Sequence, residues 1–330
     1  MGRTMSENDP KTPENLPEPV AKTEAVQTGW LAAINPTNAM RVIHGIGRIA
    51  GTASRLSNSL SQTVRENKAK DTISAAIAQR IATGIAAESP QFERAFAREA
   101  DRLLREQENL DQVADIAMET LGQKAEKDFE PGDLDEDWLH QFEDAAKGYS
   151  SERMKHTFGR LLAGEILRPG SFSPATLKAV ATMSSTDAQL IVTFLSLAYK
   201  PALPNQPVSP QLLTAGTFPG SNGLLEFGLS YGNLSLLQQC GFLSHDLSTS
   251  RTVQAVLFTL VPALIGSQFC QFIDSVSGEP SRSLQVEGLI LTKVGEEIAK
   301  IVEVGKPPDN YLTKLSEHME GTHQLKLLRL

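Results

Sequence analysis

The chain has 330 residues, a formal net charge of -8, 40% hydrophobic residues and 21% charged residues. It is long enough to bury a core without disulfides or metal ions, and its acidic total argues against a protein that binds nucleic acid over its whole surface. Cys240 and Cys270 stand outside any CxxC pattern, which argues against a cysteine metal or redox motif and fits a reducing compartment.

The first predicted elements are an irregular tail and a cationic helix. Residues 1–28 are rich in Pro, Glu, Thr and Lys, so we expect a disordered tail. Residues 29–65 carry apolar side chains at spacings of three and four, which predicts one helix. Three arginines spaced seven apart lie on nearly the same side of that helix: Arg41, Arg48 and Arg55.

This arginine stripe has two interpretations. A cationic amphipathic helix binds anionic membranes or nucleic acid, although each charge near an anionic bilayer contributes only about 1 kcal/mol. The structural interpretation is that the arginines meet the acidic helix predicted at 91–122. We favour the structural interpretation because that opposite charge is already in the chain.

A long amphipathic helix at residues 90–122 is the clearest element, and a weaker helical stretch at 70–88 precedes it. The other faces of the long helix are charged, which is typical of a helix in a bundle or a coiled coil. Its apolar positions keep a near-heptad rhythm that Gln107 interrupts: Phe96, Leu103, Leu110, Ala114, Ala117 and Leu121.

Four shorter helices complete a helical domain that we place at residues 29–200. Each has a boundary signal in the sequence: a capping residue, a proline in the first turn, or a Pro-Gly pair after the last turn. The expected elements are a helix from Asp135 that buries Trp138, a helix at 151–167 ended by Pro169 and Gly170, a helix capped by Ser173, and a helix from Ser184 to Leu197.

Two places in this domain are candidate sites, each with a structural alternative. Glu165 follows Gly164 inside a helix, where a buried carboxylate has a shifted pKa. Alternatively, Gly164 lets another backbone come close, and Glu165 pairs with an arginine or caps a neighbouring helix. The Gly170 turn before Ser173 can bind an anion at a helix N-terminus, or Ser173 caps its own helix. We favour the structural alternative at both places.

No catalytic, cofactor or metal motif is recognisable in the sequence. The histidines stand in no metal-ligand spacing, and the glycines at 45–51 depart from a dinucleotide fingerprint in spacing and in having no strand before them. We therefore expect no enzyme activity, no cofactor, no metal ion and no small-molecule substrate.

A smaller α+β unit follows the helical domain. Residues 201–223 are rich in proline and glycine, which predicts an irregular connection to a domain at 224–330. The order helix, strand, strand, helix in that domain favours a winged-helix-like module, and the chain as a whole is mainly α. The expected elements are a helix at 234–241, strands at 253–260, 268–276 and 284–291, a helix at 293–304, and a terminal helix from 307 with a frayed end.

Several segments together resemble a bacterial family, the domain of unknown function 2806. The central block runs from Asp137-Trp138-Leu139 through Leu162-Ala163-Gly164-Glu165-Ile166 to Pro169-Gly170-Ser171-Phe172-Ser173. Further similar elements lie at 105–110, 237–242 and 291–298, so the resemblance covers roughly residues 40–315. The chain departs from the family pattern at 155–158, where Phe158 stands in place of an expected Trp.

The resemblance implies a fold but no activity, because the family has none assigned. Its central block is also distantly similar to abortive-infection alpha-type proteins, which are associated with phage resistance, and that similarity is an analogy.

The leading hypothesis for function is a non-enzymatic interaction or regulatory protein that binds a protein partner or a second copy of itself. The first alternative is a phage-defence component that attaches to a membrane surface through residues 29–65. The second is DNA binding by the winged-helix-like unit, which the acidic total charge disfavours. We expect a cytoplasmic protein, peripheral to the inner membrane under the first alternative.

Overall fold

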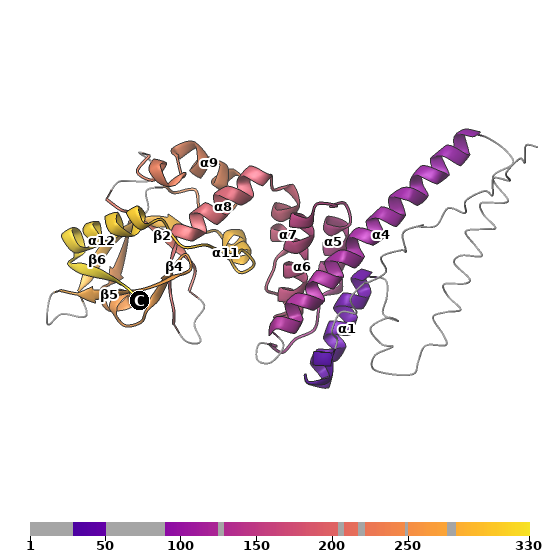
Figure 1. The fold of residues 1–330 in the computed structure, drawn as a ribbon, viewed down its shortest axis with the longest axis horizontal. Helices are drawn as coiled ribbons and strands as arrows, with labels where there is room; N and C mark the ends of the chain where they lie inside the picture. Colours follow the sequence, from indigo (N-terminus) through magenta and orange to yellow (C-terminus); the bar gives the residue numbers. More distant parts are fainter. Residues whose placement is uncertain are drawn as a thin grey trace, which may run out of the picture.

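The computed structural model shows a helical bundle joined to a unit built around an antiparallel sheet (Figure 1). The predicted tail at 1–28, the helical stretch at 70–88, and the part of the first helix that contains Arg55 lie outside the described residues. The residues that the structure describes are 29–50, 90–124, 129–203, 208–216, 222–247, 250–275 and 282–330.

The bundle forms because the apolar stripe of one long helix packs against three others. Leu110, Ala114, Ala117 and Leu121, all from the predicted near-heptad, are buried. Gln107 interrupts the stripe because its side-chain amide donates to the carbonyl of Ala50, 2.9 Å away. The bundle elements are the 3-10 helix η1 (Gly29–Ala32) and the helices α1 (Pro36–Ala50), α4 (Pro90–Lys124), α5 (Glu136–Ala146), α6 (Glu152–Leu167) and α7 (Pro174–Thr182).

The contact between α4 and α6 is the most extensive in the bundle and depends on a glycine. A Cβ atom placed on Gly159 of α6 would lie 2.5 Å from Cγ2 of Ile116 on α4. A side chain at that position would therefore push the two helices apart, whereas glycine lets them approach closely. Phe158 and Phe142 lie in the same core, with ring centroids 5.7 Å apart.

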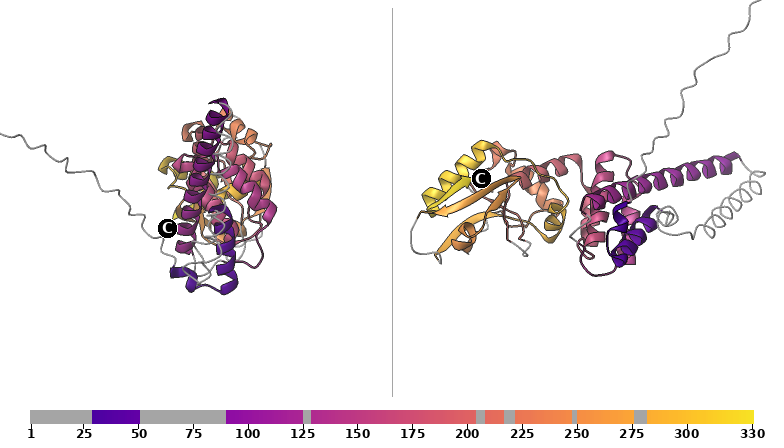
Figure 2. Two further views of the ribbon diagram at one scale, coloured as in Figure 1. Left: turned by 90° about the vertical axis from the view of Figure 1, so that its right-hand side faces the viewer. Right: turned by 60° about the horizontal axis from the view of Figure 1, so that its bottom comes forward.

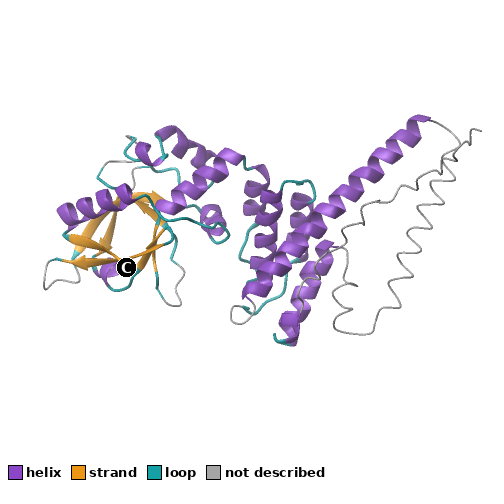
Figure 3. Ribbon diagram, viewed as in Figure 1, coloured by secondary structure: helices purple, strands orange, loops and turns teal. Residues whose placement is uncertain are grey.

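The second unit surrounds a sheet in which every pairing is antiparallel (Figure 3). The strand order is β3-β6-β2-β1-β4-β5-β7. The strands are β1 (Tyr199–Pro201), β2 (Gln211–Leu213), β3 (Ser250–Gln254), β4 (Ala263–Ile265), β5 (Gln268–Asp274), β6 (Ser283–Ile290) and β7 (Leu325–Arg329). The helices of this unit are α8 (Ser185–Leu197), η3 (Leu225–Phe227), α9 (Tyr231–Gln239), α10 (Val256–Thr259), α11 (Lys293–Ala299) and α12 (Asp309–His323).

The sheet curls so that distant strands share a neighbour. The short helix α10 contacts both β3, at one end of the strand order, and β5, near the other. Helix α8 packs against α9 and β2, so it lies with the sheet rather than with the bundle (Figure 1). Inside the unit, the aromatic side chains of Tyr199, Phe258 and Phe272 contact one another.

Three local predictions in this unit are wrong, each because a partner strand decides the structure. The segment 201–223 is not wholly irregular, since β2 lies within it and pairs with β1 and β6. The strand expected at 253–260 ends at Gln254 and gives way to α10. The end of the chain is not frayed, because β7 pairs with β5. Strands this short have little intrinsic preference and depend on cross-strand contacts.

Several predictions are confirmed. Asp135 caps α5, and Ser184 with Asp187 forms the capping box of α8. The unit after the bundle is mixed α+β, as expected, with more strands than the two on which the winged-helix likeness rests. Within the described part of the chain, no helix has the length and the hydropathy that crossing a membrane requires.

Candidate functional site

Two buried carboxylates meet where the bundle joins the sheet unit. Glu165 of α6 is 2% exposed and Glu297 of α11 is 3% exposed. Both bind the segment that leads from α6 into α7. We call Glu165, Glu297, Ser173 and Thr176 the carboxylate cluster.

Glu165 holds the turn that follows its own helix. Its carboxylate oxygens accept hydrogen bonds from the backbone N–H of Gly170, at 2.5 Å, and of Phe172, at 3.0 Å. Its observed partners are therefore backbone amides rather than the arginine that the structural alternative named. Burial raises the pKa of Glu165 above its ordinary value, the loop amides oppose that rise, and the nearby Glu297 adds to it.

Gly164 is required by an aromatic ring and not by a neighbouring backbone. A Cβ atom at this position would lie 2.7 Å from Cε2 of Phe172. The ring of Phe172 is buried, and Nζ of Lys300 lies 5.8 Å from its centroid. Gly164 and Glu165 thus both position the following turn. Gly164 leaves room for the ring of Phe172, and Glu165 binds the turn through its carboxylate. Pro169 and Gly170 lie in that turn, where Gly170 has a left-handed φ of 82°.

Glu297 occupies the N-terminus of α7. Its Oε2 accepts from the N–H of Ser173 at 2.6 Å, from the hydroxyl of Ser173 at 2.9 Å, and from the hydroxyl of Thr176 at 2.6 Å. The hydroxyl of Ser173 therefore binds Glu297 instead of capping its own helix. A helix N-terminus favours an anion, and here the anion is a side chain from the other unit.

The described arginines of the stripe make contacts within the bundle, but not with the acidic helix α4 that we expected. Nη1 of Arg41 donates to the carbonyls of Glu130, at 2.7 Å, and Ile166, at 3.2 Å, and Arg41 is 7% exposed. Arg48 pairs with Glu143 of α5 at 2.8 Å. The acidic partner is thus α5, although α1 also packs against α4, and Arg41 binds backbone carbonyls instead of a carboxylate.

Trp138, another candidate, is a core residue. It is 4% exposed and its ring stacks on Phe142 with centroids 5.2 Å apart. Its position in the bundle explains its place in the central block without a binding role.

The N-terminal half of α4, residues 90–107, projects beyond the bundle (Figures 1 and 2). We call it the projecting half of α4. Leu103 is 54% exposed and Leu104 is 70% exposed. Arg102 pairs with Glu99 and Glu106 on the same helix. These two leucines are the largest apolar side chains exposed on the described part of α4.

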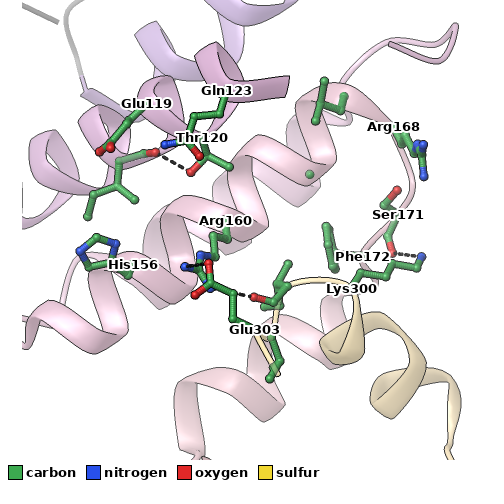
Figure 4. Close-up of a pocket in the computed structure, with 15 residues that line it drawn as sticks. Glu119, Thr120, Gln123, His156, Arg160, Arg168, Ser171, Phe172, Lys300 and Glu303 are labelled. Carbon is green, nitrogen blue, oxygen red and sulfur yellow. Dashed lines mark hydrogen bonds and ion pairs between the residues drawn. The ribbon is translucent and has the colours of Figure 1, made fainter. Parts of the chain in front are cut away.

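A cleft of about 490 Å³ lies along α6, beside the carboxylate cluster (Figure 4). Its lining joins α4, α6, the turn that contains Ser171, and residues 300–303 after α11. The cations His156, Arg160, Arg168 and Lys300 line it together with Glu119 and Glu303, His156 being a cation only when protonated. Among the described residues, no group of three His, Cys, Asp or Glu side chains is placed to hold a metal ion.

Several of these residues carry no local signal in the sequence. Glu297 and Arg160 each lie in an ordinary charged helix turn, and their partners are 124 and 143 residues away. Such long-range partners leave no spacing pattern within one helix. Phe172 lies within the Gly170–Ser173 turn, and an apolar side chain in a polar turn is the one local signal for it.

Comparison with known proteins gives one result. The family model described as "Protein of unknown function (DUF2806)" matches residues 93–316. No curated protein and no solved structure matches the chain.

Proposed function

This chain belongs to the DUF2806 family of proteins of unknown function, and from its own geometry we propose that it is a non-enzymatic interaction protein that pairs with a second copy of itself. The proposed contact is the projecting half of α4. One observation carries the proposal: the apolar stripe of α4 continues beyond the bundle that buries it.

The positions of the leucines support this contact. Leu103 lies seven residues before the buried Leu110, so both lie on nearly the same side of α4. The carbonyl of Ala50 in α1 accepts from Gln107, and Leu103 and Leu104 lie about one turn farther along α4. Exposed leucine at a core position of a heptad is the usual basis of helix pairing, since burial of each stabilises the pair by roughly 1.5–3 kcal/mol.

A second copy is the partner that fits best. The charges beside Leu103 are balanced on α4 itself, because Arg102 binds Glu99 and Glu106, so the helix needs no charged partner. Two copies related by a two-fold axis would present the same leucines to each other. Gln107, a polar residue in the stripe, would then limit the register of pairing, as single polar core residues do in coiled coils.

The test is the mass of the full-length protein measured by light scattering, with Leu103→Glu as the variant. We expect a dimer for the parent chain and a monomer for Leu103→Glu, because a charge would have to be buried in the pair. The control is Ala95→Glu, which places a new carboxylate on an exposed position of the same projecting half. Far-ultraviolet circular dichroism establishes that each variant keeps its helices.

Two outcomes contradict self-association. A parent chain that has the monomer mass at every concentration removes the proposal directly. A dimer that persists in Leu103→Glu moves the contact away from the projecting half of α4.

Membrane attachment through residues 29–65, as in a phage-defence component, ranks second. Arg41 is buried and Arg48 pairs with Glu143, which leaves fewer of the stripe's cations for lipid headgroups. Equal recovery in the soluble fraction after liposome flotation, with and without residues 29–65, rejects this alternative.

DNA binding by the winged-helix-like unit ranks third. Two cations of that unit, Lys314 and Arg329, pair with Glu226 and Asp309. A mobility shift that stays absent at low salt removes this alternative, because phosphate contacts are strongest there.

A further inference from the structure

The floor of the cleft is one face of α6. His156, Arg160, Gly164 and Arg168 follow one another at intervals of four, so they share that face. At about 1.5 Å per residue, the row extends over roughly 18 Å. Glu119, Thr120 and Gln123 of α4 line one side, and residues 300–303 line the other (Figure 4). We call this feature the α6 groove.

Its size fits a small molecule. Pockets for small molecules have volumes of about 300–1,000 Å³ and few, well-placed polar groups. The α6 groove, at about 490 Å³, is within this range. Since α4 and α6 belong to the bundle while Lys300 and Glu303 follow α11, a molecule in the groove would touch both units.

Two of the cations are held in place by the protein. Nη1 of Arg160 donates to the carbonyl of Ile301 at 3.2 Å, and Nη2 donates to Oε1 of Glu303 at 2.6 Å. Lys300 donates to the carbonyl of Ser171 at 3.3 Å and lies over the ring of Phe172. Such contacts reduce the conformational entropy that binding an anion would otherwise cost.

The carboxylate of Glu303 indicates which kind of ligand the α6 groove binds. Its side chain is 83% exposed, whereas that of Arg160 is 31% exposed. An ion pair this exposed stabilises a protein only weakly, so another anion can replace Glu303. An arginine guanidinium binds phosphate or carboxylate oxygens with two parallel hydrogen bonds. An anion that binds Arg160 in this way can displace the single exposed carboxylate of Glu303.

We propose that the α6 groove binds a small molecule that carries phosphate or carboxylate groups at two points. One group takes the place of the Glu303 carboxylate on Arg160, and the other lies near Lys300 and Arg168. Figure 4 shows the two positions on either side of Phe172. This site is independent of self-association through α4, and either proposal can fail without the other.

Isothermal titration calorimetry on the full chain tests the site with three probes: ATP, inorganic pyrophosphate and citrate, each without added metal. We expect saturable binding of at least one probe. Arg160→Gln should weaken it about tenfold or more, since a charge-assisted hydrogen bond contributes about 1.5–3 kcal/mol. Glu303→Gln should tighten it, because the competing carboxylate is gone. A phosphate-only response and a citrate response distinguish the two kinds of anion.

Matched controls separate the groove from general surface charge. Arg153→Gln removes the same charge from an exposed position of α6 outside the groove, and Glu320→Gln makes the same change as Glu303→Gln on α12. Both should leave the affinity within about twofold of the parent, because these exposed charges do not line the groove and salt screens their effect on it. The proposal is overturned if no probe binds at millimolar concentration, or if Arg153→Gln weakens binding as much as Arg160→Gln.

Discussion

Glu165 and Glu297 are buried beside each other but bind different donors. Glu165 accepts hydrogen bonds from backbone amides of the turn after α6. Glu297 accepts hydrogen bonds from one backbone amide and two hydroxyls at the start of α7. The amides stabilise the ionised form of Glu165, but burial and the proximity of Glu297 oppose it and raise its pKa. The raised pKa of Glu165 therefore makes the stability of this junction depend on pH.

We expect replacement of Glu165 to change how stability depends on pH. A carboxyl group whose pKa is higher in the folded than in the unfolded chain stabilises the fold fully at pH below its ordinary value of 4.5. That contribution is lost as the pH rises through the folded value. Glu165→Gln cannot ionise, so the advantage of the parent over this variant should be larger at mildly acidic pH than at neutral pH.

Urea unfolding of both proteins at the two pH values measures this difference. Glu108→Gln, at an exposed position of α4, is the control and should show no such change. If the parent and Glu165→Gln differ by the same free energy at both pH values, Glu165 does not carry the pH dependence.

At the scale of elements, α1 uses two arginines of one stripe in different ways. The Arg41 side chain reaches the carbonyl of Ile166 near the end of α6 and the carbonyl of Glu130. Arg48, one heptad later, forms an ion pair on the surface of α5, where its side chain is 40% exposed. The same spacing therefore produces one buried contact that fixes three segments and one exposed pair.

This difference predicts unequal costs for the same substitution. Arg41→Gln should lower the free energy of unfolding by about 2–3 kcal/mol, because buried carbonyls lose a charged donor. Arg48→Gln should lower it by less than about 1 kcal/mol, as is usual for exposed ion pairs. Urea unfolding measures both, and the two variants control for each other in charge. Equal losses would contradict the structural role given to Arg41.

The helices and strands were predictable from sequence where their own residues form a recognisable local pattern. The near-heptad predicted α4, and the capping residues Asp135 and Ser184 placed the starts of α5 and α8. The strands β2 and β7 were missed because three to five residues of strand are specified by the neighbouring strand and not by a local pattern.

The candidate site shows the same limit. The local sequence points to Glu165 and Ser173 as candidates. It does not point to Glu297, because Glu297 lies beside them only in the folded chain.

At the scale of the whole molecule, few contacts join the bundle to the sheet unit, and Glu297 makes the most buried of them. Helix α11 packs on α7, and the carboxylate of Glu297 binds the first turn of α7. Further polar links run from Arg160 to residues 301 and 303, from Lys300 to the carbonyl of Ser171 and from Arg153 to Ser185, and all are more exposed. The relative placement of the two units therefore depends strongly on one side chain.

We expect Glu297→Ala to separate the unfolding of the two units. Three donors at the start of α7 would lose their acceptor, which should cost about 2–5 kcal/mol. Differential scanning calorimetry should then resolve two transitions, or a widened one, where the parent shows greater cooperativity. Glu296→Ala makes the same change at the neighbouring position of α11 and should behave as the parent does. An unchanged profile for Glu297→Ala would show that other contacts hold the units together.

The strand order has a kinetic consequence. Gln211 of β2 pairs with Ile290 of β6, and Tyr199 of β1 pairs with Ile265 of β4. These partners are far apart in the sequence, so long stretches of chain must be brought together when the sheet forms. Chains dominated by such distant contacts fold more slowly than helical bundles. The bundle should therefore be complete while β4 and β5 still have unpaired edges. During that interval the chain is most exposed to aggregation and most in need of chaperones.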